Sequence, residues 1–244
     1  MITTRRNAIV TGAARGIGAA IAARLAEDGY GVALVDRDPA VHDVAAALGP
    51  DHHAAVVDLA DAEATRTTFA ALVEQLGGCW ALVNNAGIFL KTPLGELSVD
   101  DWDRVQAVNA RSMLLTTQAV IPAMRAVHGG RIVNIASMAA KLGTPGEAAY
   151  AASKAAVVAL TRIAAMELGP ADITVNAICP GYVLTDLGAD TRDPGQVAGW
   201  EAQSPLGRLA APDDVAATVS HLVSDDAAYV TGQALNVTGG MCTW

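Results

Sequence analysis

The chain has 244 residues, a length that suits one large domain better than two. With 52% hydrophobic and only 17% charged residues, the composition excludes a disordered chain and predicts an ample core. The net charge of −9 at pH 7, without a cluster of Lys and Arg, argues against nucleic acid and anionic membranes as partners. No apolar run reaches the roughly 18 residues of a membrane helix and no signal peptide precedes the first strand, so a cytoplasmic protein is expected.

Short β-branched segments alternate with longer alanine-rich segments along the whole chain. Strands are predicted at residues 7–12, 31–36, 53–59, 79–85, 131–137, 173–180 and 234–240. Helices are predicted to end near residues 28, 48 and 76, to span 99–127 and 147–168, and to follow Pro212. The strands read as continuous apolar runs, as parallel strands covered on both faces do. We therefore expect one α/β domain over residues 1–244, with a doubly wound (Rossmann) seven-stranded parallel sheet.

The first strand is followed by a glycine-rich turn, TGAARGIG, that opens the first helix. Glycines at this position let the backbone approach a pyrophosphate, and the helix N-terminus supplies unpaired N–H groups. Dinucleotide contacts are therefore predicted for Gly12, Arg15, Gly16, Ile17 and Gly18.

The second strand ends in Asp36, whose carboxylate is placed to accept hydrogen bonds from an adenosine ribose. Such a carboxylate repels a 2′-phosphate, whereas Arg15 and Arg37 nearby could hold one. An arginine can swing to solvent, so we expect NAD rather than NADP as cofactor.

At the end of the third strand, Asp58 and Leu59 are predicted to contact the adenine. The end of the fourth adds an NNAG motif whose small residues suit close approach to a cofactor, and its predicted contacts are Asn85, Ala86 and Gly87.

A second chemical cluster lies between residues 109 and 154. Tyr150 and Lys154 are four residues apart in an alanine-rich helix and so share one face. Lowering the pKa of a tyrosine from about 10 to about 7 requires roughly 4 kcal/mol of stabilisation of its phenolate form. A cation at about 4 Å supplies about this much at an effective dielectric constant near 20. Lys154 is therefore expected to lower the pKa of Tyr150 in shielded surroundings and to make it a general acid and base.

The motifs TGxxxGIG, NNAG, a helix Asn (Asn109), a strand-end Ser (Ser137) and YAASK, in this order, resemble the short-chain dehydrogenase/reductase superfamily over essentially the whole chain. The resemblance implies hydride transfer between a nicotinamide cofactor and a secondary alcohol or ketone. It implies a catalytic tetrad of Asn109, Ser137, Tyr150 and Lys154. In that tetrad Ser137 binds the reacting oxygen, Asn109 holds a water, and Lys154 also contacts the nicotinamide ribose. Cofactor contacts also follow for Pro180, Gly181, Val183 and Thr185.

The segment at about 182–208 lacks clear periodicity and is expected to cover the substrate. The predicted pocket residues are Ser137, Met138, Leu142, Tyr150, Tyr182, Leu187 and Trp200. Acidic residues of its rim outnumber Arg192 and Arg208, which argues against docking an acidic acyl-carrier protein. They are Asp186, Asp190, Asp193 and Glu201. We therefore expect a small alcohol, diol or hydroxy compound as substrate.

Alternatives remain open. An NADPH-dependent 3-oxoacyl-[acyl-carrier-protein] reductase shares all these motifs, and a protein that only binds dinucleotide and regulates a partner is a further possibility. Cys79, Cys179 and Cys242 form no CxxC pair, and the histidines have no motif partner, so no metal site is predicted. The helices near 99–127 and 147–168 carry apolar residues on more than one face, which predicts a dimer-based oligomer. The family resemblance implies a homotetramer.

Overall fold

The computed structural model describes residues 5–185, 187 and 193–244. Its centre is a parallel seven-stranded sheet in the order β3-β2-β1-β4-β5-β6-β7. The strands are β1 (Asn7–Thr11), β2 (Gly31–Asp36), β3 (His53–Val56), β4 (Ala81–Asn84), β5 (Gly130–Ile135), β6 (Ile173–Pro180) and β7 (Ala234–Val237). The predicted α/β class and strands are confirmed. The strand order reverses between β1 and β4, so the carboxyl ends of these strands border the crevice in which doubly wound folds bind ligands.

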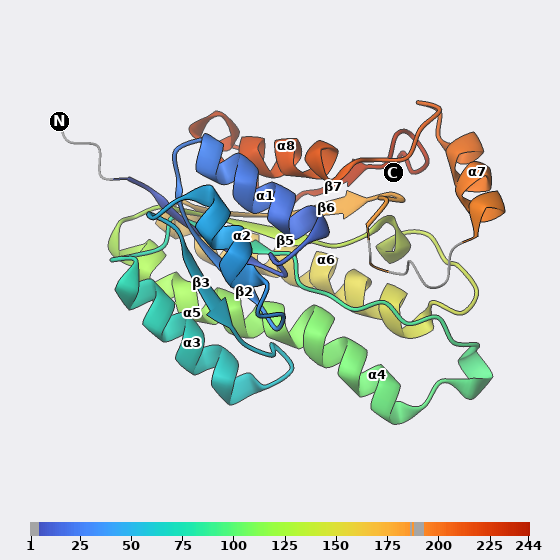
Figure 1. Cartoon of the computed structure of the whole chain (residues 1–244), viewed down its shortest axis with the longest axis horizontal. Coiled ribbons are helices and arrows are strands. Elements are labelled where there is room, and N and C mark those ends of the chain that lie inside the picture. Colours follow the sequence, from blue (N-terminus) through green and yellow to red (C-terminus); the bar gives the residue numbers. More distant parts are fainter. Residues whose placement is uncertain (1–4, 186, 188–192) are drawn as a thin grey trace.

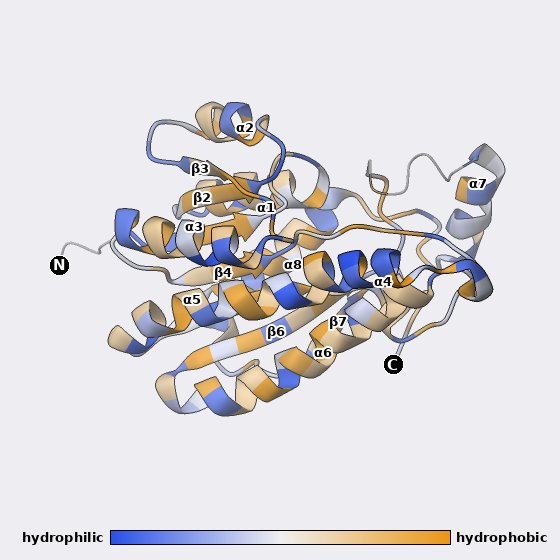
Figure 2. Ribbon diagram, turned by 90° about the horizontal axis from the view of Figure 1, so that it is seen from below, coloured by the Kyte–Doolittle hydropathy of each residue, from blue (hydrophilic) through white to orange (hydrophobic). Residues whose placement is uncertain are grey.

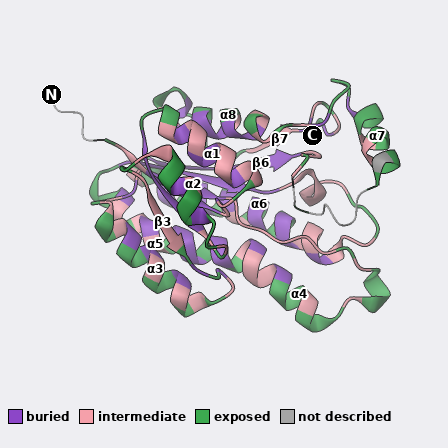
Figure 3. Cartoon of the chain, viewed as in Figure 1, coloured by how far each residue is buried: buried purple, intermediate pink, exposed green. Residues whose placement is uncertain are grey.

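Helices cover both faces of the sheet (Figure 1). One face carries α1 (Gly16–Glu27), α2 (Val41–Leu48) and α8 (Pro212–Val223). The other carries α3 (Ala62–Gln75), α5 (Ser112–Ala126) and α6 (Ala148–Leu168). A further helix, α4 (Val99–Gln106), packs against α6. Helix α7 (Pro194–Gln203), within the predicted substrate segment, lies at the edge of the molecule and is mostly exposed (Figures 1 and 3).

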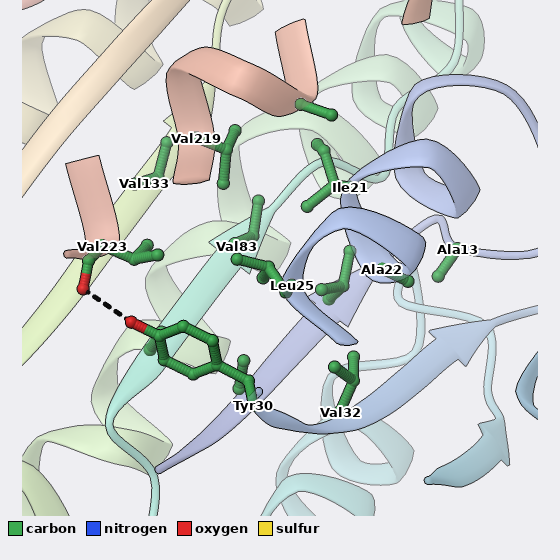
Figure 4. Packing of buried hydrophobic residues seen from close by; sticks show 14 of the residues in the cluster. Ala13, Ile21, Ala22, Leu25, Tyr30, Val32, Val83, Val133, Val219 and Val223 are labelled. Atoms are coloured by element: carbon green, nitrogen blue, oxygen red, sulfur yellow. Dashed lines mark hydrogen bonds between the residues drawn. The ribbon is translucent and has the colours of Figure 1, made fainter. Parts of the chain in front are cut away.

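The alternation of side chains along each buried strand divides the core into two layers. In β1, Ala8 and Val10 face the layer under α1 and α8, whereas Ile9 faces the layer under α3 and α5. Figure 4 shows the first layer, where the Tyr30 hydroxyl donates a hydrogen bond of 3.0 Å to the Val223 carbonyl. Two filled layers hold the sheet between the helices and fix the positions of its strand ends.

The long helix predicted over 99–127 has a more complex form in the structure. A π-helical turn, Ala107–Arg111, separates α4 from α5, and Pro122 lies within α5. A π-turn inserts one extra residue into a helix and is frequent at functional sites. Here it contains Asn109, whose side chain is buried.

One helical stretch, Ala148–Ala171, is long and apolar enough to cross a membrane by length and composition alone. In Figure 2 helix α6 carries mostly apolar residues with scattered hydrophilic ones. Nearly half of the most apolar window (44%) is buried inside the molecule. This burial is typical of a core helix, and its partners are the sheet and the layer under α3 and α5.

Candidate active site

Two adjoining cavities open at the carboxyl edge of the sheet. The smaller, of about 410 Å³, lies over the ends of β1, β2 and β4. The larger, of about 690 Å³, lies beside β5, β6 and the start of α6. They share Ile17, Asn85, Gly87, Phe89, Thr185 and Leu187 in their walls, so an extended ligand could reach from one into the other.

Most of the predicted dinucleotide residues line the smaller cavity. They are Gly12, Arg15, Gly16, Ile17, Asp36, Arg37, Asp58, Leu59, Asn85, Ala86, Gly87 and Thr185. Pro180, Gly181 and Val183, together with Tyr150 and Lys154, line the larger cavity instead. Gly18 lines neither: a Cβ there would lie 2.0 Å from the Gly12 carbonyl oxygen, so its role is to let α1 pack closely against the turn.

The start of α1 suits a pyrophosphate. No side chain caps this helix and no acidic residue lies in its first turn, so its first N–H groups face the smaller cavity without a competing carboxylate. Gly12 and Gly16 have φ of 65° and 57°, a left-handed conformation that favours glycine. These features fit the pyrophosphate of a nicotinamide dinucleotide.

Asp36 is held firmly at the end of β2. Its two carboxylate oxygens accept hydrogen bonds of 3.0 Å from the backbone N–H groups of Ala14 and Asp38. Arg15, one of the two arginines that could hold a 2′-phosphate, has its guanidinium 3.8 Å from the Asp38 carboxylate. The smaller cavity thus has a fixed carboxylate, that of Asp36, at the end of β2. The guanidinium of Arg15 beside it already has an acidic neighbour, Asp38.

The residues predicted to carry the chemistry meet in the larger cavity. The hydroxyl of Tyr150, in the first turn of α6, lies within hydrogen-bonding reach of Ser137, which follows β5. The Tyr150 ring also packs edge to face on Phe89, with centroids 5.1 Å apart. The Ser137 hydroxyl accepts a hydrogen bond of 3.1 Å from the Ala139 N–H, which fixes its position at the cavity wall.

Lys154 lies one turn further along α6 and is buried, with 3% of its surface exposed. Its ammonium donates a hydrogen bond of 2.8 Å to the Ile135 carbonyl and lies 5.8 Å from the centre of the Tyr150 ring. A Cβ on Gly87 would be 3.4 Å from the same nitrogen, so glycine at this position leaves room for the ammonium beside the fourth strand end.

The pKa values of this pair correct the expectation drawn from the sequence. Burial raises the pKa of Tyr150 to about 12, the Ser137 hydrogen bond opposes that rise, and the nearby charge of Glu147 adds to it. Burial likewise lowers the pKa of Lys154 to about 8. Apolar surroundings strengthen the attraction between the two groups, but they also penalise each charged form, and the penalty is the larger effect here. The predicted lowering of the Tyr150 pKa by Lys154 was wrong for this structure.

Asn109 lies in the π-turn, and its side chain is hydrogen-bonded to other residues of the protein. Its Oδ1 accepts from the Ile88 N–H at 2.8 Å, and its Nδ2 donates to the Ile88 carbonyl at 2.9 Å and to the Ser153 hydroxyl at 3.0 Å. Asn109 therefore ties the segment after β4 to α6. Its proposed part in holding a water stays a prediction.

All seven predicted pocket residues line the larger cavity: Ser137, Met138, Leu142, Tyr150, Tyr182, Leu187 and Trp200. The rings of Tyr182 and Trp200 stack with centroids 4.2 Å apart, which joins α7 to the end of β6. Asp186, Asp190 and Arg192 of the predicted rim lie outside the described residues. Arg208 forms an ion pair of 2.7 Å with Asp214, so its charge has a partner of its own.

Some wall residues were missed by sequence reasoning. Glu147, Lys91, Gln196, Gln203 and Met241 also line the larger cavity. Gln196 and Gln203 lie in the segment at about 182–208 that was predicted to cover the substrate, although neither was named. Glu147 also had a signal, because it precedes Tyr150 by three residues and so lies on the same side of the helix start. Within the described part of the chain, no group of three or more His, Cys, Asp or Glu side chains could hold a metal.

Comparison with known proteins identifies the family. The family model described as enoyl-(acyl carrier protein) reductase matches residues 12–242. The chain belongs to the short-chain dehydrogenase/reductase superfamily. As a member it is an oxidoreductase that acts on CH–OH groups with a nicotinamide dinucleotide, which confirms the predicted enzyme class.

Similar proteins cover the full length of the chain. The 3-oxoacyl-[acyl-carrier-protein] reductase FabG of Staphylococcus aureus is 39% identical over 97% of this chain and 98% of its own. The enzyme of the same name from Vibrio cholerae is 36% identical over 96% of each chain. The structure of a putative gluconate dehydrogenase from Agrobacterium tumefaciens, 34% identical, superposes with a TM-score of 0.92 over 97% of this chain and 95% of its own. The curated names agree better with the acyl-carrier-protein alternative than with a small alcohol.

Proposed function

We propose that this protein is a nicotinamide-dependent ketone reductase in which Tyr150 donates a proton to the carbonyl oxygen. The observation that carries this proposal is the pair of Ser137 and Tyr150, whose hydroxyl groups lie within hydrogen-bonding reach of each other at the wall of the larger cavity. Because burial raises the pKa of Tyr150 to about 12, the phenol is protonated at neutral pH. A protonated phenol is the form that reduction of a ketone needs.

The residues around the phenol suit this reaction. When bound, the nicotinamide supplies the hydride. The Ser137 and Tyr150 hydroxyls converge on one part of the cavity wall, where they can hydrogen-bond the carbonyl oxygen and stabilise the negative charge that develops on it. Lys154, anchored by its hydrogen bond to the Ile135 carbonyl, holds an amine 5.8 Å from the centre of the phenol ring.

The first substrate class to test is a 3-oxoacyl thioester, because the curated relatives carry that name. A second class, a small ketone that bears hydroxyl groups, is favoured by the polar wall of the larger cavity, where Glu147 and Gln196 lie. The structural relative named as a putative gluconate dehydrogenase also points to hydroxylated compounds. For both substrate classes the proposed step is the same, namely proton donation from Tyr150 to the carbonyl oxygen.

For the cofactor we propose NADH, with NADPH as the alternative that the acyl-carrier-protein reductases imply. The fixed carboxylate of Asp36 supports NADH, because a 2′-phosphate beside it would meet a like charge. The 3.8 Å approach of Arg15 to Asp38 weakens the case for that arginine as a phosphate ligand.

The role of Tyr150 is tested by Tyr150→Phe, which keeps the ring against Phe89 and removes only the hydroxyl. We expect reduction of a ketone panel, followed by nicotinamide absorbance, to fall by roughly 10²–10⁴-fold. Tyr229→Phe is the matched control, because the ring of Tyr229 is fully exposed. Full turnover by Tyr150→Phe would remove the phenol from its proposed role, and a wild-type protein that binds nicotinamide but reduces no ketone would support the regulatory alternative.

The cofactor proposal is tested by Asp36→Asn. We expect the wild type to have the higher kcat/KM with NADH. The variant should gain relative efficiency with NADPH by about tenfold, because it loses one like charge next to the 2′-phosphate. Asp43→Asn, in the neighbouring helix α2, serves as the control. A wild-type preference for NADPH would show that Asp36 does not select the cofactor.

A further inference from the structure

Glu147 is a carboxylate in the larger cavity that the proposed reaction does not use. It immediately precedes α6, in the position from which side chains cap a helix, yet its own side chain caps nothing. The backbone at this point is well fixed: the Glu147 carbonyl accepts from the Ala151 N–H at 2.8 Å, and the Gly146 carbonyl accepts from the Thr92 N–H at 2.8 Å. Gly146 has φ of 87°, so the turn itself favours glycine. The chain thus places a carboxylate at the cavity wall with no structural task in the helix.

The carboxylate is also without an internal donor. Among residues 5–185, 187 and 193–244, the hydrogen bonds and ion pairs of the structure include none to the Glu147 side chain. The cation that influences it is Lys91, whose charge opposes the rise in pKa that burial gives to Glu147. The charge of Glu147 in turn raises the pKa of both Tyr150 and Tyr182, so it lies among the hydroxyls of this cavity. Because no residue in the described part of the chain donates a hydrogen bond to this carboxylate, its oxygens are free to accept hydrogen bonds from a ligand in the cavity.

The rest of the wall indicates what kind of ligand could supply them. Thr144, Gln196 and Gln203 add polar groups, whereas Met138, Leu142 and Trp200 form an apolar side. A purely aliphatic ketone would fill the apolar side and leave the carboxylate unpaired. A cationic substrate would be repelled by Lys91, which already offsets the charge of Glu147. A neutral substrate with hydroxyl groups meets both sides of the cavity.

We propose that Glu147 is a specificity-determining residue that accepts a hydrogen bond from a hydroxyl group of the substrate, so that the substrate class is a hydroxylated ketone. The inference rests on the ketone reductase proposed above and names its substrate class. Glu147 is not a proton donor or acceptor in the reaction; it selects the group that lies beside the reacting carbonyl.

The test compares ketones of equal size that differ in one hydroxyl. The panel pairs 1-hydroxy-2-butanone with 3-pentanone, 4-hydroxy-2-butanone with 2-pentanone, and 5-hydroxy-2-pentanone with 2-hexanone, and adds acetoacetyl-coenzyme A. We expect the wild type to prefer at least one hydroxylated member by roughly ten- to hundredfold in kcat/KM, as a hydrogen bond to a charged group predicts. Glu147→Leu should abolish this preference; the readout is the ratio of kcat/KM within each pair, because removing the charge of Glu147 also acts on Tyr150 and so changes both members alike. Glu147→Gln should keep part of the preference, because its amide oxygen still accepts.

Glu167→Leu is the matched control, since Glu167 lies exposed on the same helix and its replacement removes the same charge. Equal selectivity in the wild type and Glu147→Leu would overturn the assignment of Glu147, as would an equal loss with both members of every pair. A wild type that reduces acetoacetyl-coenzyme A but shows no hydroxyl preference would overturn the substrate class and leave the reductase standing. No reduction of any member with NADH or NADPH would instead contradict the proposed function, and the inference with it.

Discussion

Lys154 is a buried residue whose protonation depends strongly on its surroundings in the fold. Its amine is buried, and its pKa falls from the ordinary 10.5 to about 8 because burial penalises the ammonium. Below pH 8 both the folded and the unfolded chain hold this proton, so the cost of burying the charge, about 3 kcal/mol, is fully present. Between pH 8 and 10.5 only the unfolded chain still binds the proton strongly. The cost is then progressively relieved, and the free energy of unfolding rises with pH in this window.

We therefore expect Lys154→Met to raise the melting temperature at pH 7 and to lose that advantage as the pH approaches 10.5. Circular dichroism melts across this range would measure it, with Arg162→Met, an exposed position on the same helix, as control. The loss of the hydrogen bond to Ile135 opposes part of the gain. A variant less stable than the wild type at every pH would show that the buried ammonium is adequately compensated.

The same pair shows how far single residues can be predicted from sequence. The spacing of Tyr150 and Lys154 correctly places both on one helical face, because this depends only on the period of the helix. The sign of the pKa change depends instead on how deeply the phenol is buried and on the charge of Glu147. Neither quantity is encoded locally, since the walls come from segments as distant in sequence as β4, β5 and α7.

At the scale of elements, the π-turn between α4 and α5 has a clear structural purpose. It directs Asn109 inward, where the side chain bonds both the N–H and the carbonyl of Ile88 and also Ser153. The segment after β4 lines both cavities and has no regular structure of its own. Its position therefore depends on such side-chain bonds.

Replacing Asn109 by Ala leaves the Ile88 N–H and carbonyl without these partners. We expect a loss of about 1–3 kcal/mol in the free energy of unfolding, measured by urea denaturation, together with weaker binding of the nicotinamide dinucleotide. Gln118→Ala on α5 is the control, because Gln118 is exposed. Equal stability of the two variants would mean that Ile88 finds other partners and that the π-turn does not hold this segment.

Strands were easier to predict than the helical irregularities. A strand buried on both faces, such as β6 with its eight buried residues, is largely apolar, and that pattern is visible in ITVNAICP, where only Thr174 and Asn176 are polar. The π-turn differs from an ordinary α-helix by one inserted residue. The residues Ala107–Arg111 contain no Gly or Pro that would indicate it in the sequence. The strand ends could thus be placed from sequence, whereas the exact path of the segment they support could not.

For the whole molecule, the exposed apolar residues are the feature that a single chain does not explain. Trp102 and Leu114, on α4 and α5, are 38% and 40% exposed, and Ile163 on α6 is 50% exposed. Val105, Val120 and Val157 from the same helices are buried. The helices thus have an inner apolar face in the core and an outer one on the surface, as their composition predicted. Large exposed hydrophobic residues on neighbouring helices are a feature of interaction surfaces.

We expect the protein to form a homotetramer in which the outer faces of α4, α5 and α6 are covered by other copies of the chain. Sedimentation velocity at micromolar concentration would measure the mass, and Leu114→Glu combined with Ile163→Glu should lower it to a dimer or monomer, because each charge would have to be desolvated at the interface. Val56→Glu is the control. Val56 is 44% exposed and lies on β3, an edge strand of the sheet, outside α4, α5 and α6. A monomeric wild type would contradict the prediction outright. A tetramer that persists in the double variant would place the interface on another surface, such as the one around the exposed Tyr229 and Trp244.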